Sequence, residues 1–119
     1  MNRRHRLGGR GRFSALRAHG VDVRRSGLRL RAVGNGLAVS RAAFAVVGAR
    51  SSVRRNRLRR RLRAAARPIV EAHPGLDVLA SVGVAWEERS FLDLGRELAL
   101  AWASAERQVL DAAVPSLLR

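Results

Sequence analysis

The stretch "RRNRLRRRLRAAAR", residues 54–67, combines dense positive charge with a helical spacing of its apolar residues. These apolar residues recur at intervals of four, three and four and therefore share one stripe of an α-helix: Leu58, Leu62, Ala65 and Ile69. At about 100° per residue, the polar side chains fall opposite this stripe or beside it: Asn56, Arg57, Arg59, Arg60, Arg61, Arg63 and Arg67. The pattern predicts a helix over residues 52–67 that buries its leucines and presents a basic face.

The flanking residues predict where this helix begins and ends. Ser51 or Ser52 can cap the first turn, because a serine hydroxyl accepts a hydrogen bond from an unpaired backbone N–H there. Pro68 is expected to kink or end the helix, since proline has no amide hydrogen to donate. The following "HPGLD", residues 73–77, is typical of a loop.

Two apolar segments before the helix have the pattern of strands. Leu28, Leu30 and Ala32 alternate with arginines, which indicates a half-buried strand with one face toward the core. A glycine-rich turn follows at residues 34–36, and a second apolar strand is expected at residues 44–47. We expect these two strands to form an antiparallel pair.

The segment after the helix predicts another strand. Residues 78–82 are an apolar run short enough for a buried strand, and Asp77 opens it after a glycine, where aspartate commonly serves a turn. The order strand, helix, strand suggests that residues 44–47 and 78–82 lie parallel around the basic helix.

Two further helices are expected near the ends of the chain. Residues 13–20 predict a short helix that Gly20 ends. Ser90 and Asp93 resemble a capping box that opens a longer helix, which Pro115 should end. Its apolar residues keep helical step: Phe91, Leu94, Leu98, Trp102, Ala105 and Val109.

The chain length of 119 residues fits a single domain. Residues 1–12 mix arginine and glycine without periodicity and are expected to be a flexible basic arm. Residues 13–110 then form the domain, and residues 111–119 a C-terminal tail. Both tryptophans, Trp86 and Trp102, are expected in the core.

The charge is strongly one-sided. The formal net charge is +15, and all 24 basic residues are arginine. Residues 1–70 hold twenty arginines against the single acid Asp22, whereas residues 71–119 hold four arginines against eight acids. Such a field attracts polyanions, which points to nucleic acid or an anionic membrane surface. Guanidinium groups bind phosphate in a forked geometry and stack on bases, so they suit RNA.

The titratable side chains predict no active site. His5, His19 and His73 lie in separate segments without a second ligand nearby in sequence, and we expect them at the surface or in loops. Glu87 and Glu88 are adjacent and therefore point apart. No serine lies in a nucleophile motif, and no glycine-rich segment completes a phosphate loop. We therefore expect no catalytic residue and no metal site in this chain.

Cysteine is absent, which excludes disulfides and thiol catalysis and fits a reducing compartment. The first residues, "MNRRHRLGGRGRF", lack the apolar stretch of a secretory signal, and no apolar run is long enough to span a membrane. A cytoplasmic protein is expected. A basic N-terminus can also direct organellar import, and that alternative stays open.

The basic helix resembles the signature helix of the bacterial ribonuclease P protein subunit. The family's Arg-Asn-Arg core corresponds to Arg55, Asn56 and Arg57, and the pattern continues in register through Arg63. The stretches "SRAAFAVV" and "HPGLDVLASV" are similar to the family's strands before and after that helix. The N-terminal "RLGGRGRFSALRAHG" is similar to the family's N-terminus, whose characteristic residues fall at Arg6, Leu7, Phe13 and Gly20.

The resemblance, which covers residues 6–105, implies a fold and a function. The fold would be an α/β (α+β) two-layer sandwich with a mixed sheet of about four strands packed by helices. Its βαβ crossover would be left-handed, against the general right-handed rule. The family subunit binds a catalytic RNA, and the complex removes the 5′ leader from precursor tRNA. Chemistry would belong to Mg²⁺ bound mainly by the RNA, with no membrane and no obligate protein partner involved.

The resemblance also implies roles for individual residues. Contacts to the catalytic RNA are expected from the signature helix: Arg55, Asn56, Arg57, Arg59, Arg60, Arg61 and Arg63. A cleft for the 5′ leader is expected between the sheet and the N-terminal helix, lined by Phe13, Arg17, Arg29 and Arg31. Phe13 would stack on a base there, and the alternative for this residue is an anchor in the core.

The chain departs from the family pattern at three places. The family carries two lysines and a glycine before Arg-Asn-Arg, whereas "VVGARSSV" is one residue shorter, so phosphate binding by the loop at residues 47–52 rests on Arg50 alone. Gly83 stands where the family tends to end its strand with arginine. The N-terminal helix has Leu16 and Arg17 where a second aromatic residue is common.

Two other functions compete with this interpretation. A structural RNA-binding protein, for instance a ribosomal one, would use the same basic helix without supporting cleavage. A membrane-surface module would also use positive charge, but the apolar stripe from Leu58 to Ile69 is narrow and lacks bulky aromatic anchors.

Overall fold

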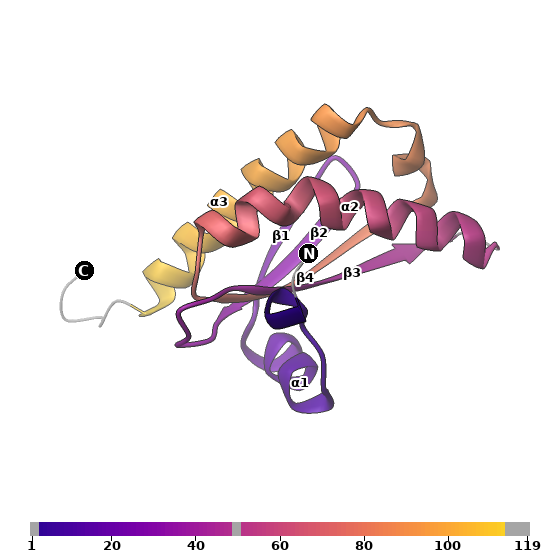
Figure 1. The fold of residues 1–119 in the computed structure, drawn as a ribbon. Coiled ribbons are helices and arrows are strands. Elements are labelled where there is room, and N and C mark those ends of the chain that lie inside the picture. Colours follow the sequence, from indigo (N-terminus) through magenta and orange to yellow (C-terminus); the bar gives the residue numbers. More distant parts are fainter. Residues whose placement is uncertain (1–2, 49–50, 114–119) are drawn as a thin grey trace.

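A four-stranded sheet with three α-helices forms the part of the chain that the computed structural model describes, residues 3–48 and 51–113 (Figure 1). The helices α2 and α3 cover one side of the sheet, and α1 lies on the other (Figure 1). The elements, in chain order, are η1 (Arg3–His5), α1 (Arg10–His19), β1 (Val21–Arg25), β2 (Leu28–Gly34), β3 (Arg41–Val47), α2 (Ser52–Ala72), β4 (Leu76–Gly83), η2 (Val84–Glu88) and α3 (Phe91–Ala113). The mixed α+β architecture predicted from the sequence is confirmed.

The strand order is β1-β2-β4-β3. β3 and β4 are parallel neighbours joined through α2, as the sequence predicted, while β2 pairs antiparallel with both β1 and β4. The expected antiparallel pair of residues 28–32 and 44–47 is therefore wrong, because β4 lies between these two strands. β4 is buried along most of its length, so it takes a central position with a partner on each side.

β1 was missed by the sequence analysis. Its register with β2 leaves only Ser26 and Gly27 as the loop, and both have positive φ, at 51° and 86°. Two residues with positive φ are what a tight hairpin turn requires. Because Arg24 and Arg25 interrupt the apolar pattern of the strand, its only strong sequence signal was this turn.

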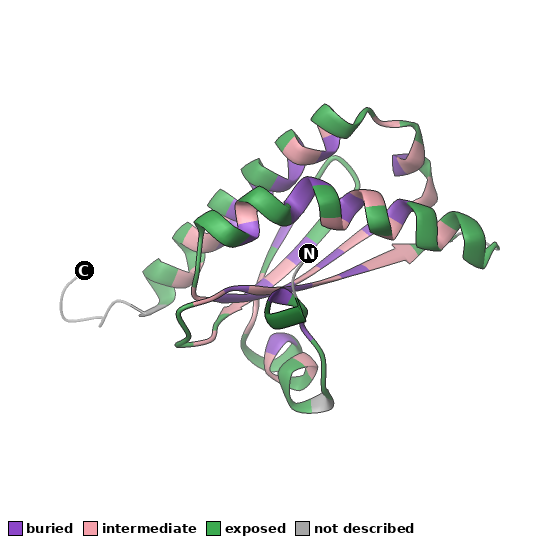
Figure 2. Ribbon diagram, viewed as in Figure 1, coloured by how far each residue is buried: buried purple, intermediate pink, exposed green. Residues whose placement is uncertain are grey.

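The core lies between the sheet and the layer of α2 and α3, where the buried residues of these elements face one another (Figure 2). Leu58 and Leu62 are 1% and 0% exposed, so the predicted apolar stripe of α2 is confirmed. Both tryptophans are also buried as predicted. Phe91 differs from the expectation: it lies in the first turn of α3, ahead of the packed region, and is exposed.

α2 continues for a full turn beyond the proline that was expected to kink or end it. The helix runs from Ser52 to Ala72 with Pro68 inside it, and Ser51 caps its start by accepting a hydrogen bond from the Arg54 backbone N–H at 3.4 Å. In an uninterrupted helix, the backbone N–H of residue 68 would donate to the Ala64 carbonyl, and Pro68 has no N–H. Both Ala64 and Pro68 are exposed. Water can satisfy a carbonyl there, which makes the interruption tolerable.

The N-terminal segment is attached to the sheet and does not extend as the expected flexible arm. Leu7 is buried and its N–H donates to the Ala42 carbonyl at 3.0 Å, while Arg6 forms a parallel bridge with Ala42. His5, expected at the surface, is buried with Nδ1 3.0 Å from the Ser40 carbonyl oxygen. Apolar contact by Leu7 and this side-chain hydrogen bond fix a segment whose arginines suggested disorder. α1 runs from Arg10 to His19, so it begins three residues before the predicted start at Phe13, and Gly20 caps its end as predicted.

Asp77 does more than serve a turn. It is buried and accepts hydrogen bonds from Arg41 Nε at 2.8 Å and Arg41 Nη2 at 2.7 Å, and from Asn35 Nδ2 at 2.9 Å. Arg41 and Asp77 are register partners on β3 and β4, so the pair joins the first residue of β3 to the second residue of β4.

The C-terminal helix begins as the sequence predicted. The Ser90 hydroxyl accepts a hydrogen bond from the Asp93 backbone N–H at 3.1 Å. α3 extends to Ala113, so residues 111–113 belong to the helix and not to a tail. The predicted end at Pro115 lies outside the described residues, as does Arg50 in the loop between β3 and α2.

Replacing Leu62 with alanine should destabilise the protein by about 2–5 kcal/mol, because it removes a fully buried side chain and leaves a cavity. Chemical denaturation followed by circular dichroism measures this change. The matched control is Leu92→Ala, since Leu92 is 84% exposed on α3 and should change stability by no more than about 0.5 kcal/mol. Equal effects of the two variants would show that α2 is not anchored through its leucines.

Candidate nucleic-acid interface

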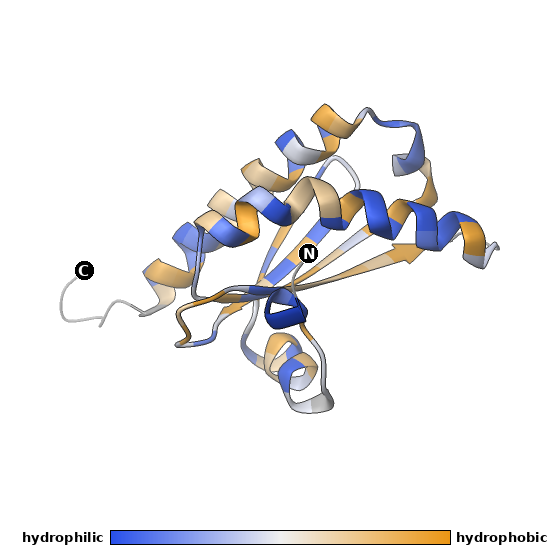
Figure 3. Ribbon diagram, in the orientation of Figure 1, coloured by the Kyte–Doolittle hydropathy of each residue, from blue (hydrophilic) through white to orange (hydrophobic). Residues whose placement is uncertain are grey.

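The arginines of α2 form a basic surface on the side of the helix that faces away from the core. The hydrophilic residues concentrate toward the N-terminal half of the helix, and alanines follow in the other half (Figure 3). Burial of Leu58 and Leu62 fixes the rotation of the helix, so the predicted RNA contacts take different exposures. Three are exposed: Asn56, Arg57 and Arg60. Four are half-buried: Arg55, Arg59, Arg61 and Arg63.

Two of these guanidinium groups, those of Arg60 and Arg63, have no protein partner among the described residues. Arg57 lies near the Glu87 carboxylate and adds to the effect of Arg54 in lowering the pKa of that carboxylate. Arg57, Arg60 and Arg63 make no hydrogen bond or ion pair within the described part of the chain, and Arg59 donates to the Asn56 side-chain oxygen. Because Asn56 is neutral, the Arg59 charge is not compensated by this contact. This part of α2 therefore presents uncompensated positive charge to solvent.

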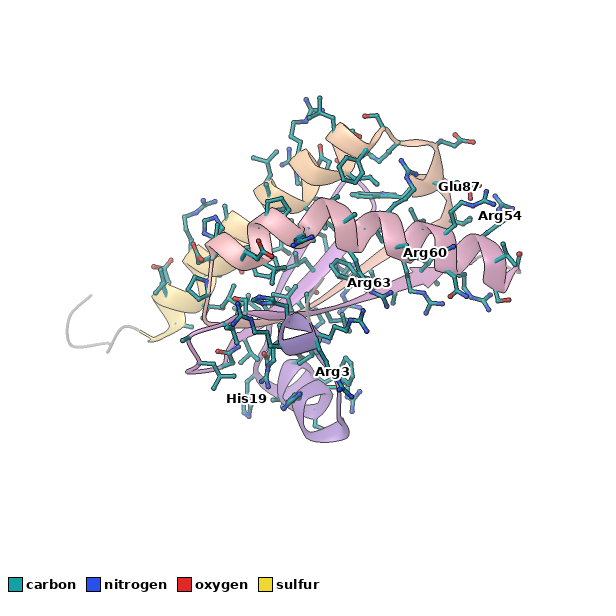
Figure 4. All side chains as sticks on the ribbon, viewed as in Figure 1. Arg3, His19, Arg54, Arg60, Arg63 and Glu87 are labelled. Atoms are coloured by element: carbon teal, nitrogen blue, oxygen red, sulfur yellow. The ribbon has the colours of Figure 1, made fainter. Side chains whose placement is uncertain are left out.

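The N-terminal segment adds a cation that the sequence analysis did not assign to the site. Arg6 lines a common depression with Arg60, Arg63 and Arg67 of α2. Burial lowers the pKa of the Arg63 guanidinium, and repulsion from Arg6 and Arg59 lowers it further. Figure 4 shows Arg60 and Arg63 on the side of α2 that faces η1. The only sequence signal for Arg6 was its place in the N-terminal motif.

Arg54 and Arg61 are arranged differently, because the η2 region supplies each of them with a partner. Arg54 forms an ion pair with Glu87 of η2, and the two side chains lie together in Figure 4. The hydrogen bond from Arg54 lowers the pKa of the Glu87 carboxyl below its ordinary value. Arg61 donates to the backbone carbonyls of Glu87 and Arg89 at 2.9 and 2.7 Å. No local pattern of residues indicated these contacts, because the partners are distant in the chain.

The four residues expected in a leader cleft share one side of the sheet. Arg29 and Arg31 alternate along β2 with the buried Leu28, Leu30 and Ala32, so they point away from the core. α1, which carries Phe13 and Arg17, packs against β2 and β4 on that same side (Figure 1). Phe13 is half-buried and Arg17 is exposed.

The surface between α1 and the sheet, formed by Phe13, Arg17, Arg29 and Arg31, is called the second surface. Hydrogen bonds within it orient its arginines. Arg31 Nη2 donates to the Arg17 carbonyl at 3.1 Å and so ties the last turn of α1 to β2. Its Nε is buried and has no hydrogen-bond partner among the described residues. Arg29 Nε lies 3.1 Å from Asp22 Oδ1, and this hydrogen bond lowers the pKa of the Asp22 carboxyl. Asp22 is thus a member of the surface that sequence reasoning missed.

Within residues 3–48 and 51–113, no group of three or more His, Asp or Glu side chains is arranged to hold a metal ion. None of the helices described there is long and apolar enough to cross a membrane. His19 and His73 are exposed, as expected. Glu88 is exposed, whereas Glu87 is held by Arg54, so the two adjacent carboxylates do not form a pair.

The fold is that of the bacterial ribonuclease P proteins. A mutant of the Staphylococcus aureus RNase P protein, described as defective in mRNA degradation activity, superposes with a TM-score of 0.73 at 16% identity, covering 87% of this chain and 89% of that one. The RNase P protein of Thermotoga maritima superposes with a TM-score of 0.69 at 22% identity, covering 86% and 96%. No curated protein sequence matches the chain significantly.

The sequence assigns the chain to the same group. The family model described as Ribonuclease P matches residues 1–106, and the chain belongs to this family. Family and fold together support a subunit of ribonuclease P, a tRNA-processing activity in which the protein works with an RNA subunit.

Proposed function

We propose that this protein binds the catalytic RNA of ribonuclease P through α2 and supports removal of the 5′ leader from precursor tRNA. The observation that carries the proposal is the uncompensated charge on α2: Arg60 and Arg63 have no described partner, Arg57 makes no described hydrogen bond or ion pair, and Arg6 adds to their charge. Like charges three and four residues apart on a helix repel one another. RNA phosphates would relieve this repulsion and accept forked hydrogen bonds from the guanidinium groups.

The second surface, between α1 and the sheet, would hold the single-stranded leader. Phe13 would stack on a base, since the residue is only half-buried and leaves part of its surface accessible. Arg29 and Arg31 would attract the leader phosphates. The buried Arg31 Nε is a hydrogen-bond donor with no acceptor among the described residues. Arg17 would add charge at the exposed rim of α1.

The chemistry would be supplied by Mg²⁺ bound mainly by the RNA subunit. The described residues offer no cluster of carboxylates to hold such an ion, so we assign this chain no ligand to it. Its arginines would instead bring the RNA and the precursor tRNA together by neutralising phosphate charge. The protein would thus act by binding and orienting its two RNA partners.

Cleavage of precursor tRNA tests this function. Adding the protein to a bacterial ribonuclease P RNA at low Mg²⁺ should raise the cleavage rate about tenfold, equivalent to ~1.4 kcal/mol, because its arginines replace part of the screening by the metal. The rate is measured under single-turnover conditions. RNA binding without any stimulation would favour a structural RNA-binding protein instead.

Replacing Arg57, Arg60 and Arg63 together with glutamine should weaken RNA binding and flatten its salt dependence. Each lost phosphate contact lowers the slope of log affinity against log salt by about 0.7 to 0.9, so the slope should fall by about 2 to 3. Filter binding across a salt series measures it. The control is Arg107→Gln, which removes an exposed charge from α3. An equal change in both proteins would exclude α2 as the contact surface.

Phe13→Leu separates stacking from core packing. If Phe13 stacks on the leader, this variant should bind precursor tRNA more weakly by about 1–3 kcal/mol, because leucine keeps apolar contact but has no ring. Binding of tRNA without a leader should not change. A loss of thermal stability with unchanged leader affinity would instead assign Phe13 to the core.

A further inference from the structure

Arg61 differs from Arg57, Arg60 and Arg63 of the signature helix, because its guanidinium donates hydrogen bonds to backbone carbonyls. Nη1 donates to the Glu87 carbonyl at 2.9 Å and Nη2 donates to the Arg89 carbonyl at 2.7 Å. Both terminal nitrogens are therefore directed at the end of η2, and the side chain is half-buried. Hydrogen bonds from a charged donor to a carbonyl are stronger than neutral ones, so this contact holds η2 against α2.

The η2 segment that Arg61 holds connects three parts of the fold. Trp86 is buried, and its Nε1 donates to the Ser26 carbonyl in the β1–β2 turn at 3.0 Å. The Arg89 guanidinium lies over the Trp86 ring at 4.5 Å and bonds Asp93 of α3 at 2.6 Å. Movement of η2 would therefore disturb the hairpin, the start of α3 and the tryptophan together.

The same segment carries the carboxylate that neutralises the start of α2. Glu87 accepts from Arg54 and lines a depression with Arg54, Arg57 and Arg61. Its pKa is lowered chiefly by the Arg54 hydrogen bond, with a smaller contribution from Arg57. A phosphate approaching Arg54 would have to displace this carboxylate, and the negative charge of Glu87 would oppose it.

The neighbouring residue, Arg60, provides the contrast. It is exposed and has no hydrogen bond or ion pair among the described residues. A phosphate can reach its whole guanidinium without breaking a protein contact. A phosphate that bound both terminal nitrogens of Arg61 would have to replace the Glu87 and Arg89 carbonyls, which would leave these carbonyls without their donors.

We propose that Arg61 and Glu87 are positioning residues of the RNA-binding helix. Arg61 holds η2, η2 places the Glu87 carboxylate on Arg54, and the phosphate contacts of α2 come from Arg57, Arg60 and Arg63. Arg61 of the signature pattern, and Arg54 directly before that pattern, thus serve the fold. The assignment of phosphate contacts to α2 rests on the proposed function. The role of Arg61 in holding η2 rests only on the contacts within the protein.

The experiment compares Arg61→Gln with Arg60→Gln in the full chain. Binding to an in vitro transcribed bacterial ribonuclease P RNA is measured across a salt series, together with thermal unfolding. Arg61→Gln should not flatten the salt slope, and should steepen it to the extent that a displaced η2 releases Arg54 from Glu87. It should lower the melting temperature by roughly 5–15 °C, because two charge-assisted hydrogen bonds are lost. Arg60→Gln should lower the slope by about 0.7 to 0.9 and leave the melting temperature unchanged.

A spectroscopic measurement reports on η2 directly. In a Trp102→Phe background, Trp86 is the remaining one of the two tryptophans. Its emission should shift in Arg61→Gln and not in Arg60→Gln. Arg61→Lys keeps the charge but cannot reproduce the two-pronged contact, so it should show the same emission shift with a salt slope no flatter than that of the wild type. Arg61→Lys serves as the test if Arg61→Gln does not fold.

Glu87→Gln tests the other half of the proposal. Removing the carboxylate releases Arg54, so the salt slope should become steeper by about 0.7 to 0.9, as for one added phosphate contact. An unchanged or flatter slope would overturn the role of Glu87.

The outcomes distinguish this inference from the proposed function. If Arg61→Gln flattens the salt slope as much as Arg60→Gln and leaves stability and Trp86 emission unchanged, Arg61 binds RNA and the inference is wrong. If neither Arg60→Gln nor Glu87→Gln alters RNA binding, the proposed RNA-binding role of α2 fails. An emission shift in Arg61→Gln would then still support its hold on η2.

Discussion

The structure depends on α2 burying Leu58 and Leu62 while seven arginines occupy residues 54–63. Each buried leucine contributes about 1.5–3 kcal/mol, whereas each close pair of like charges on a helix costs only about 0.2–0.5 kcal/mol. Burial therefore decides the rotation of the helix about its axis, and the arginines take whatever positions remain. The basic face is a consequence of how the apolar face is packed.

The two ends of this basic face are treated differently by the rest of the fold. Near the start of α2, the acidic C-terminal half of the chain supplies Glu87, and η2 supplies backbone carbonyls to Arg61. Farther along the helix, the charged groups that act on Arg63 among the described residues are the cations Arg6 and Arg59, although Arg67 beyond them pairs with Glu71. The uneven distribution of charge along the sequence thus becomes an uneven distribution in space. Compensated arginines stabilise the protein, and uncompensated ones remain available to a polyanion.

The failures of sequence reasoning have specific physical causes. β1 was hidden because Arg24 and Arg25 break the apolar alternation, although the Ser26–Gly27 turn marked the hairpin. The N-terminal segment was assigned to a flexible arm because arginine and glycine dominate its composition, while its attachment rests on the single contacts of Leu7 and His5. Asp22 was noted as the single acid of residues 1–70 but not placed in the surface, because Arg29 reaches it only after the hairpin has formed.

The sequence alone determined the helices, the alternation of β2, the parallel strand-helix-strand unit and the family resemblance, because each depends on the spacing of residues close together in the chain. Tertiary structure alone decided that β4 separates β2 from β3, and that Arg61 and Arg60 have different surroundings. The carbonyls that bind Arg61 lie 26 and 28 residues away. A guanidinium group contacts whatever the fold brings near it, and local spacing carries no record of that neighbour.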